Sequence, residues 1–151
     1  MTKIGSVLVV CVGNICRSPV GERLLARALP QTRVGSAGIG AVVGASADQT
    51  MSEVAAANGL SLEGHVARQF SSEMGAAHEL ILVMEPGHRA EIIRQAPHLS
   101  GRVMLFDQWT GAKGIPDPYR EPIETHRAAY GAIAAAAEGW ITRLTPKLPQ
   151  S

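Results

Sequence analysis

The chain has 151 residues, of which 46% are hydrophobic and 18% are charged, and its formal net charge is +1. This composition excludes a disordered chain and a protein that coats nucleic acid through bulk positive charge, and the length is typical of one domain. No apolar run approaches the about 18 residues of a membrane span, and two cysteines form no disulfide framework. We therefore expect a single cytoplasmic domain over residues 1–151, with no membrane insertion and no nucleic-acid partner.

Apolar runs and helical patterns alternate along the chain. In chain order, the predicted elements are a strand at 6–10, a helix at 19–29, a strand at 33–36, a helix at 48–58, a strand at 79–84, a helix at 86–95, a strand at 103–106 and a helix at 124–144. Strands that alternate with helices pair in parallel through right-handed crossovers. Continuously apolar strands indicate that helices cover both faces. The sequence therefore predicts an α/β domain with a parallel sheet.

Residues that start helices mark several of these boundaries. Ser18 is the predicted N-cap of the first helix, and Pro19 would occupy the favoured first helical position. Asp48 is predicted to cap the second helix. The glycine- and proline-rich segments 37–47 and 111–122 are predicted to be loops.

The segment Cys11-Val-Gly-Asn-Ile-Cys-Arg17-Ser18 joins the first strand to the first helix. A thiol attacks phosphorus only as a thiolate, which backbone N–H groups, a helix N-terminus and Arg17 would all stabilise. The same donors can hold three phosphoryl oxygens, and the guanidinium offers them a planar fork. The chain lacks the glycine motifs of nucleotide-binding loops. We predict Cys11 as a nucleophile in a phosphate-binding loop that also contains Val12, Gly13, Asn14, Ile15, Cys16, Arg17 and Ser18.

Three residues of this loop have predicted supporting roles. Gly13 allows a tight turn with close approach of the backbone to a ligand. Asn14 tolerates a left-handed conformation and can lock the loop through its side-chain amide. Ser18 can donate a hydrogen bond to the sulfur of Cys11, which would help the thiolate leave when a phospho-enzyme is hydrolysed.

A phosphatase also needs a proton donor for the leaving oxygen. The segment Ile115-Pro-Asp117-Pro-Tyr119 supplies a candidate, because prolines on both sides stiffen the backbone that carries the carboxylate. An Asp-Pro pair alone indicates only a turn. Together with the cysteine loop, it predicts Asp117 as the proton donor.

With these motifs the chain resembles the low-molecular-weight protein tyrosine phosphatases. The matching motifs are residues 10–19, Ser36-Ala-Gly, His65-Val-Ala-Arg-Gln69 and Asp117-Pro-Tyr119. The resemblance implies a four-stranded parallel sheet between helices, with the phosphate-binding loop after the first strand. It implies Cys11 as nucleophile, Arg17 as phosphate clamp, and Asp117 as general acid and then as base. It implies no metal and no cofactor.

The resemblance also implies roles for residues outside the loop. Asn14, Ser36 and His65 would hydrogen-bond together and keep the loop in its strained shape. Tyr119 would wall the cleft and stack on the substrate ring. The other wall carries Ile39 and no aromatic residue, so we expect aliphatic contact there. The role of Cys16 stays open, because this residue could either form a protective disulfide with Cys11 or be a small buried residue.

Three segments resemble one bacterial branch of the family more closely, the phosphatases of capsule and exopolysaccharide export; they are residues 36–44, 62–69 and 103–106. Members of that branch act on the phosphotyrosine-rich tail of a tyrosine autokinase. The resemblance thus implies a phosphotyrosine protein as substrate, inorganic phosphate as product, and a monomer or weak self-association.

Three alternatives use the same loop. Arsenate reductases need two further cysteines to relay a disulfide, and none follows Cys16. Protein-arginine phosphatases tend to carry a small polar or β-branched residue inside the loop, where this chain has Ile15. A non-catalytic phosphotyrosine-binding module would be favoured by replacement of Cys11, Arg17 or Asp117, and all three are present.

Overall fold

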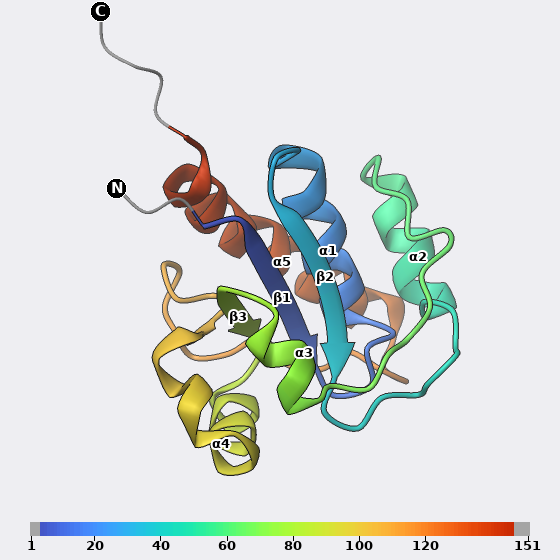
Figure 1. Cartoon of the computed structure of the whole chain (residues 1–151). Coiled ribbons are helices and arrows are strands. Elements are labelled where there is room, and N and C mark those ends of the chain that lie inside the picture. The colour runs from blue at the N-terminus through green and yellow to red at the C-terminus, as the bar shows by residue number, and fades with distance from the viewer. Residues whose placement is uncertain (1–3, 147–151) are drawn as a thin grey trace, which may run out of the picture.

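A parallel four-stranded sheet lies at the centre of the structure, a computed structural model that describes residues 4–146 (Figure 1). Its strands are β1 (Ser6–Cys11), β2 (Arg33–Gly38), β3 (Leu80–Val83) and β4 (Val103–Leu105), in the order β2-β1-β3-β4. The helices are α1 (Arg17–Ala28), α2 (Gln49–Ala57), α3 (Ser72–Ala76), α4 (Pro86–Gln95), the 3₁₀ helix η1 (Pro97–Arg102) and α5 (Ile123–Leu144). The predicted α/β class and parallel sheet are confirmed.

Helices cover both faces of this sheet, which explains why β1 is apolar along its whole length. Alternate side chains of a strand point to opposite faces. Val7 and Val9 pack in one core with residues of α1, α2 and α5, whereas Leu8 and Val10 pack in a second core with residues of α4 and η1. Figure 1 shows α1 and α5 behind the strands and α3 in front of them.

The strand order places a ligand-binding crevice at the end of β1. The chain leaves β1 through α1 to β2 on one side, whereas β3 pairs with β1 on the other side. Ligands in open α/β sheets bind where the order reverses in this way, beyond the carboxyl ends of the strands. Cys11 ends β1 and Glu85 lies two residues beyond β3, so both lie at this crevice.

The start of α1 differs from the prediction. The helix begins at Arg17 with Cys16 as N-cap, and no side chain caps it. Ser18 therefore lies inside the first turn, and Pro19 is the third helical residue instead of the first. The hydroxyl of Ser18 contacts Cys11 and Asn14 instead of capping the helix. The other predicted cap is confirmed, because the carboxylate of Asp48 accepts a hydrogen bond from the backbone N–H at position 51 of α2.

β2 continues two residues beyond its predicted end, to Gly38. A Cβ atom at Gly38 would lie 2.2 Å from the carbonyl oxygen of Val12, far inside van der Waals contact. Only glycine therefore allows the phosphate-binding loop to lie against the end of β2. Apolar patterning cannot detect a strand end of this kind, because glycine has no side chain to place.

The long loop before α5 is fastened to the sheet. The carboxylate of Asp107 accepts hydrogen bonds from the backbone N–H groups of Lys113 and Gly114, at 3.1 and 2.9 Å. The N–H of Ile115 then donates to the carbonyl of Met84, at the end of β3, at 2.8 Å. These bonds hold the Asp117 segment beside the crevice. No helix among residues 4–146 is long and apolar enough to span a membrane.

Candidate active site

Cys11 ends β1 with its sulfur next to the hydroxyl of Ser18. The two atoms, Sγ and Oγ, lie 2.9 Å apart. The Ser18 hydroxyl also accepts a hydrogen bond from the Asn14 side-chain amide, at 2.8 Å. A hydroxyl carries one proton, and since its oxygen already accepts from Asn14, that proton is available to the sulfur. Such a bond stabilises a thiolate.

Asn14 is the centre of a hydrogen-bond network that holds the phosphate-binding loop. Its φ of +58° is left-handed, as predicted. Its amide donates to Ser36 Oγ at 2.9 Å, and its Oδ1 accepts from the N–H of Arg68 at 2.8 Å. His65 Nε2 lies 2.6 Å from its carbonyl oxygen. The structure thus brings Asn14, Ser36 and His65 together. It adds Glu22, which accepts from Ser36 Oγ at 2.6 Å.

Arg17 is almost fully buried and lies at the floor of the site, with 1% of its side chain exposed. Its Nη1 donates to Glu85 Oε2 and to the carbonyl of Ile115, both at 2.6 Å. Its Nε has no hydrogen-bond partner among the described residues, and its Nη2 lies 3.7 Å from Asp117 Oδ2. The Nε and Nη2 edge is therefore the side of the guanidinium fork that can bind two oxygens of a phosphate.

Glu85 was not identified from the sequence. It follows β3, so its position at the carboxyl end of a buried strand was the available signal. His88 supports it from the next turn, with Nε2 at 3.4 Å from Glu85 Oε2. Burial, and then the positive charge of Arg17, lowers the pKa of His88, against the opposing effects of Glu85 and Asp117. His88 is therefore neutral at pH 7.

The catalytic candidates converge on one cavity of about 190 Å³. Asp117 and Tyr119 lie at its rim, with 43% of the Asp117 side chain and 41% of Tyr119 exposed. The carboxylate of Asp117 accepts a hydrogen bond from the N–H of Tyr119 at 3.1 Å, which fixes its orientation. The residues that line the cavity are Cys11, Val12, Gly13, Ile15, Cys16, Arg17, Gly40, Val42, Asp117 and Tyr119.

The aliphatic wall is formed by Val42 instead of Ile39. Ile39 does not line the cavity, and its side chain packs against the core that contains Leu8 and Val10. The backbone N–H groups of Ile39 and Gly40 donate to the carbonyls of residues 11 and 12. Residues 39 and 40 therefore run alongside the start of the phosphate-binding loop, and the side chain that faces the cavity comes only after them. The prediction of Ile39 as the cleft wall is wrong by three positions.

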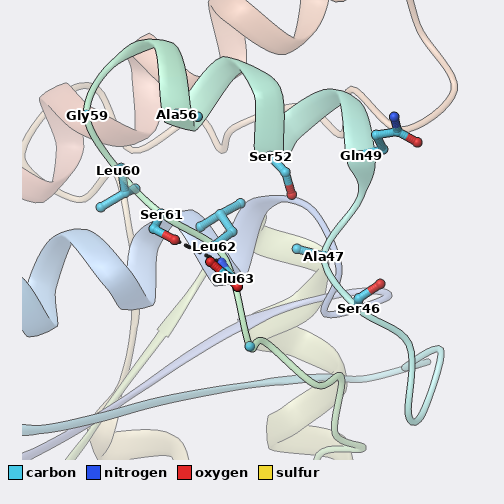
Figure 2. A pocket seen from close by; sticks show the side chains of 11 residues that line it. Ser46, Ala47, Gln49, Ser52, Ala56, Gly59, Leu60, Ser61, Leu62 and Glu63 are labelled. Atoms are coloured by element: carbon cyan, nitrogen blue, oxygen red, sulfur yellow. Dashed lines mark hydrogen bonds between the residues drawn. The ribbon is translucent and has the colours of Figure 1, made fainter.

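A larger groove of about 710 Å³ lies elsewhere, between α2 and residues 59–64 (Figure 2). Figure 2 shows Gln49 and Ser52 on the α2 side and Ser61 and Glu63 on the other. None of the predicted site residues lines this groove. Its lining consists of serine, alanine, glycine, leucine and glutamine residues and one glutamate, with no cysteine, histidine or arginine. The chemistry therefore belongs to the smaller cavity.

Comparison with known proteins decides the family. The sequence model described as low molecular weight phosphotyrosine protein phosphatase matches residues 6–150. This chain belongs to that family. The phosphatase is 48% identical over 143 residues to the low molecular weight protein-tyrosine-phosphatase Etp of Escherichia coli K12, covering 95% of this chain and 97% of Etp. It is 45% identical to the crystal structure of the tyrosine phosphatase Wzb from Escherichia coli K30 in complex with sulphate, with a TM-score of 0.92 and coverage of 93% and 99%. The chain is thus a protein-tyrosine-phosphatase.

A more distant relative has another substrate in its name. The phosphatase is 31% identical to the YwlE arginine phosphatase from Geobacillus stearothermophilus, with a TM-score of 0.86 and coverage of 92% of both chains. Ile15 lines the cavity. Because isoleucine is itself β-branched, branching at this position does not separate the two activities. Ile15 therefore fits the pattern expected of arginine phosphatases and does not distinguish this loop from theirs.

Cys16 is the remaining member of the loop, and both cysteines are free thiols. Burial raises the pKa of the Cys16 thiol above its usual range, and the negative charges of Asp48 and Asp117 add to the effect. Cys16 is therefore protonated at pH 7. A protonated thiol is a poor nucleophile, so Cys16 does not compete with Cys11 for a phosphoryl group.

Proposed function

We propose that this phosphatase hydrolyses protein phosphotyrosine through a cysteinyl-phosphate intermediate. The observation that carries the proposal is the convergence of the Cys11 sulfur, the Nε and Nη2 edge of Arg17 and the Asp117 carboxyl on one cavity. In the first step a bond forms between Cys11 Sγ and phosphorus while the phosphorus–oxygen bond to the phenol breaks. Asp117 donates its proton to the departing phenolate oxygen.

The second step returns the enzyme to its starting state. The Asp117 carboxylate accepts a proton from a water molecule, whose oxygen attacks the phosphorus. The sulfur–phosphorus bond breaks and inorganic phosphate is released. The thiolate leaves more readily because Ser18, at 2.9 Å, can donate a hydrogen bond to it. Arg17 and the loop N–H groups stabilise the charge on the phosphoryl oxygens in both steps.

The walls of the cavity support an aromatic substrate. Tyr119 and Val42 are exposed at the rim, at 41% and 50%, and both line the cavity that ends at Cys11. A phosphotyrosine ring can contact both walls while its phosphate reaches the loop. Phosphoserine is too short to do so. We therefore infer a preference for phosphotyrosine that depends on these two side chains.

The proposed protein substrate is the tyrosine-rich tail of a bacterial tyrosine autokinase that controls capsule or exopolysaccharide production, dephosphorylated in the cytoplasm. The support is the resemblance of residues 36–44, 62–69 and 103–106 to that branch of the family. An autokinase encoded beside this chain would supply the natural test substrate. Its phosphorylated tail should be hydrolysed with a higher kcat/KM than an unrelated phosphotyrosine peptide, and equal values would contradict this assignment.

The second candidate substrate is phosphoarginine, which the likeness to the YwlE arginine phosphatase favours. One experiment tests both candidates. Steady-state hydrolysis of phosphotyrosine, phosphoserine and phosphoarginine peptides is measured with the wild-type enzyme and with Cys11→Ser. We expect turnover of phosphotyrosine alone, and none by the variant. Preferential turnover of phosphoarginine would reassign the substrate, and turnover by Cys11→Ser would refute the cysteinyl-phosphate mechanism.

A further inference from the structure

Three potential metal ligands meet behind the phosphate-binding loop. They are the sulfur of Cys16, a carboxylate oxygen of Asp48 and a ring nitrogen of His126, and all lie within 4.8 Å of one another. Each comes from the start of a helix: Cys16 is the N-cap of α1, Asp48 is the N-cap of α2, and His126 lies in the first turn of α5. The proposed hydrolysis uses none of the three side chains.

The hydrogen bonding of His126 leaves one nitrogen directed at this cluster. Its Nδ1 lies 3.2 Å from the carbonyl oxygen of Pro122. A carbonyl only accepts hydrogen bonds, so Nδ1 carries a proton and Nε2 is the ring nitrogen that faces the cluster. Nε2 is buried without a hydrogen-bond partner among the described residues, although Asp48 Oδ2 lies 3.3 Å away.

A lone pair that faces a carboxylate oxygen is repelled by it unless a positive charge lies between them. Either a proton on Nε2 or a metal cation can supply that charge. Cys16 favours the metal, because its sulfur lies with the other two ligand atoms within 4.8 Å and has no place in a proton bridge between them, whereas cysteine sulfur is a strong ligand for a soft or borderline cation. Cys16 and His126 are buried, at 3% and 1% exposure, so bulk water does not compete for the centre.

We propose that Cys16, Asp48 and His126 bind a zinc ion. Sulfur, carboxylate oxygen and imidazole nitrogen are the ligands that zinc takes in proteins, with water as a fourth. Bond lengths of about 2.0–2.3 Å require tetrahedral ligands to lie about 3.5 Å apart. His126 Nε2 and Asp48 Oδ2, at 3.3 Å, already have this spacing, so only the Cys16 sulfur, within 4.8 Å of both, has to close in, by at most roughly an ångström. The Cys16 S–H bond breaks as the zinc–sulfur bond forms, and the proton passes to solvent.

The surrounding contacts are those of a metal site. A metal-ligating histidine donates its other ring N–H to a carbonyl or carboxylate, as His126 does to Pro122. The carboxylate of Asp48 is oriented by the backbone N–H of Met51, at 2.9 Å. Asp48 retains 17% side-chain exposure, which gives the ion a route to the site. Bound zinc would join the loop to α2 and α5.

The experiment measures zinc binding to the reduced, metal-free enzyme by calorimetry. Cys11→Ser removes the other thiol, so that only the proposed site is observed. We expect one zinc per chain in this variant. Adding His126→Phe or Asp48→Asn should weaken binding by at least about 10–100-fold, since even residues that only orient a ligand have effects of that size. Asp48→Asn keeps an oxygen for the α2 cap, so its fold should be preserved. His98→Gln, at an exposed histidine, is the control and should bind like its parent.

Cobalt identifies the ligands independently of affinity. In Cys11→Ser, bound cobalt should show thiolate-to-metal charge-transfer absorption, which Cys16→Ser in that background should abolish. Zinc should also raise the melting temperature of Cys11→Ser, but not that of its His126→Phe derivative. Loss of all binding in Cys11→Ser would mean that the catalytic thiol holds the ion. Either that result or unchanged affinity in His126→Phe and Asp48→Asn would overturn the proposal.

Discussion

The carboxyl group of Asp117 lies at the rim of the cavity, fixed by its own segment and 3.7 Å from Arg17 Nη2. If it protonates the leaving phenolate, Asp117→Asn should lower kcat for a phosphotyrosine peptide by about 10²–10⁴-fold. The loss should shrink as the phenol becomes more acidic, because an acidic phenol leaves without a proton. The measurement is kcat across a series of aryl phosphates. Glu121→Gln, at an exposed carboxylate of the same segment, should leave kcat unchanged. A uniform loss over the series would contradict the assignment.

Glu85 fixes Arg17 through the 2.6 Å bond to Nη1, and this bond leaves the Nε and Nη2 edge directed at the cavity. Glu85→Ala should therefore weaken phosphate binding. A hydrogen bond to a charged group contributes about 1.5–3 kcal/mol. Because Glu85 is partly exposed, we take the lower limit, which corresponds to an about tenfold loss of phosphate affinity. Inorganic phosphate should inhibit the variant about tenfold more weakly, with a similar fall in kcat/KM. Glu91→Gln changes an acidic residue of α4, the helix that follows Glu85, and this residue does not line the cavity, so the change should have no effect. Unchanged inhibition by phosphate in Glu85→Ala would remove Glu85 from the site.

The contact between the end of β2 and the phosphate-binding loop depends on the absence of a side chain at Gly38. A methyl group there would meet the Val12 carbonyl at 2.2 Å and the Asn14 nitrogen at 3.0 Å, so the loop must move. Gly38→Ala should destabilise the fold by about 1–3 kcal/mol, the usual cost of overpacking. It should also lower kcat/KM strongly, because the displaced loop N–H groups bind the phosphate.

The matched control for this prediction is Gly131→Ala in α5, where a Cβ atom would meet nothing within 4 Å. That variant should keep full activity and gain up to about 1 kcal/mol, since alanine is the better helix former. Urea unfolding and steady-state kinetics measure both effects. Normal activity in Gly38→Ala would show that the loop tolerates displacement.

At the scale of the elements, two helix starts that a characteristic residue marks, at Asp48 and Pro86, were predicted correctly. The predicted helix at about 86–95 matches α4, whose start is marked by Pro86 at its first position. The end of β2 was missed because its last residue is a glycine. The wall at Val42 was missed for a related reason, since Ile39 is the larger side chain but the loop directs it into the core. Once a strand has ended, the apolar pattern alone does not predict whether a side chain faces the core or the cavity.

At the scale of the whole molecule, the pairing order of the strands was the main unknown. Residues 11–18 are contiguous, so Cys11 and Arg17 could be identified from spacing alone. Asp117 required a proline-bounded motif in a distant segment. Glu85 meets Arg17 only because β3 pairs with β1, and no local pattern encodes which strands are neighbours. The sequence could therefore place Glu85 at the carboxyl end of a strand, but not beside Arg17.

Buried histidines should make the stability of the whole molecule depend on pH. Burial is the largest cause that lowers the pKa of His78 and of His88, and nearby arginines add to it. In the unfolded chain both return to about 6.5. Below that value the unfolded state binds more protons than the folded state, so the free energy of unfolding falls as the pH falls. Each histidine adds at most about 1.4 kcal/mol per pH unit to the slope of the free energy of unfolding against pH. This contribution begins as the pH falls through about 6.5 and ends once the pH lies below the lowered pKa of the folded state.

Urea unfolding between pH 5 and 7 measures this slope, in a range where ordinary carboxylates stay ionised. His78→Gln and His88→Gln should each flatten the curve, because the variant takes up one proton fewer on unfolding. His98→Gln removes an exposed histidine and should leave the slope unchanged. The two buried replacements can also lower the free energy of unfolding at pH 7, but only the slope of this free energy against pH reports proton uptake by the histidine. Equal slopes in all four proteins would mean that these histidines keep their protons in the folded enzyme.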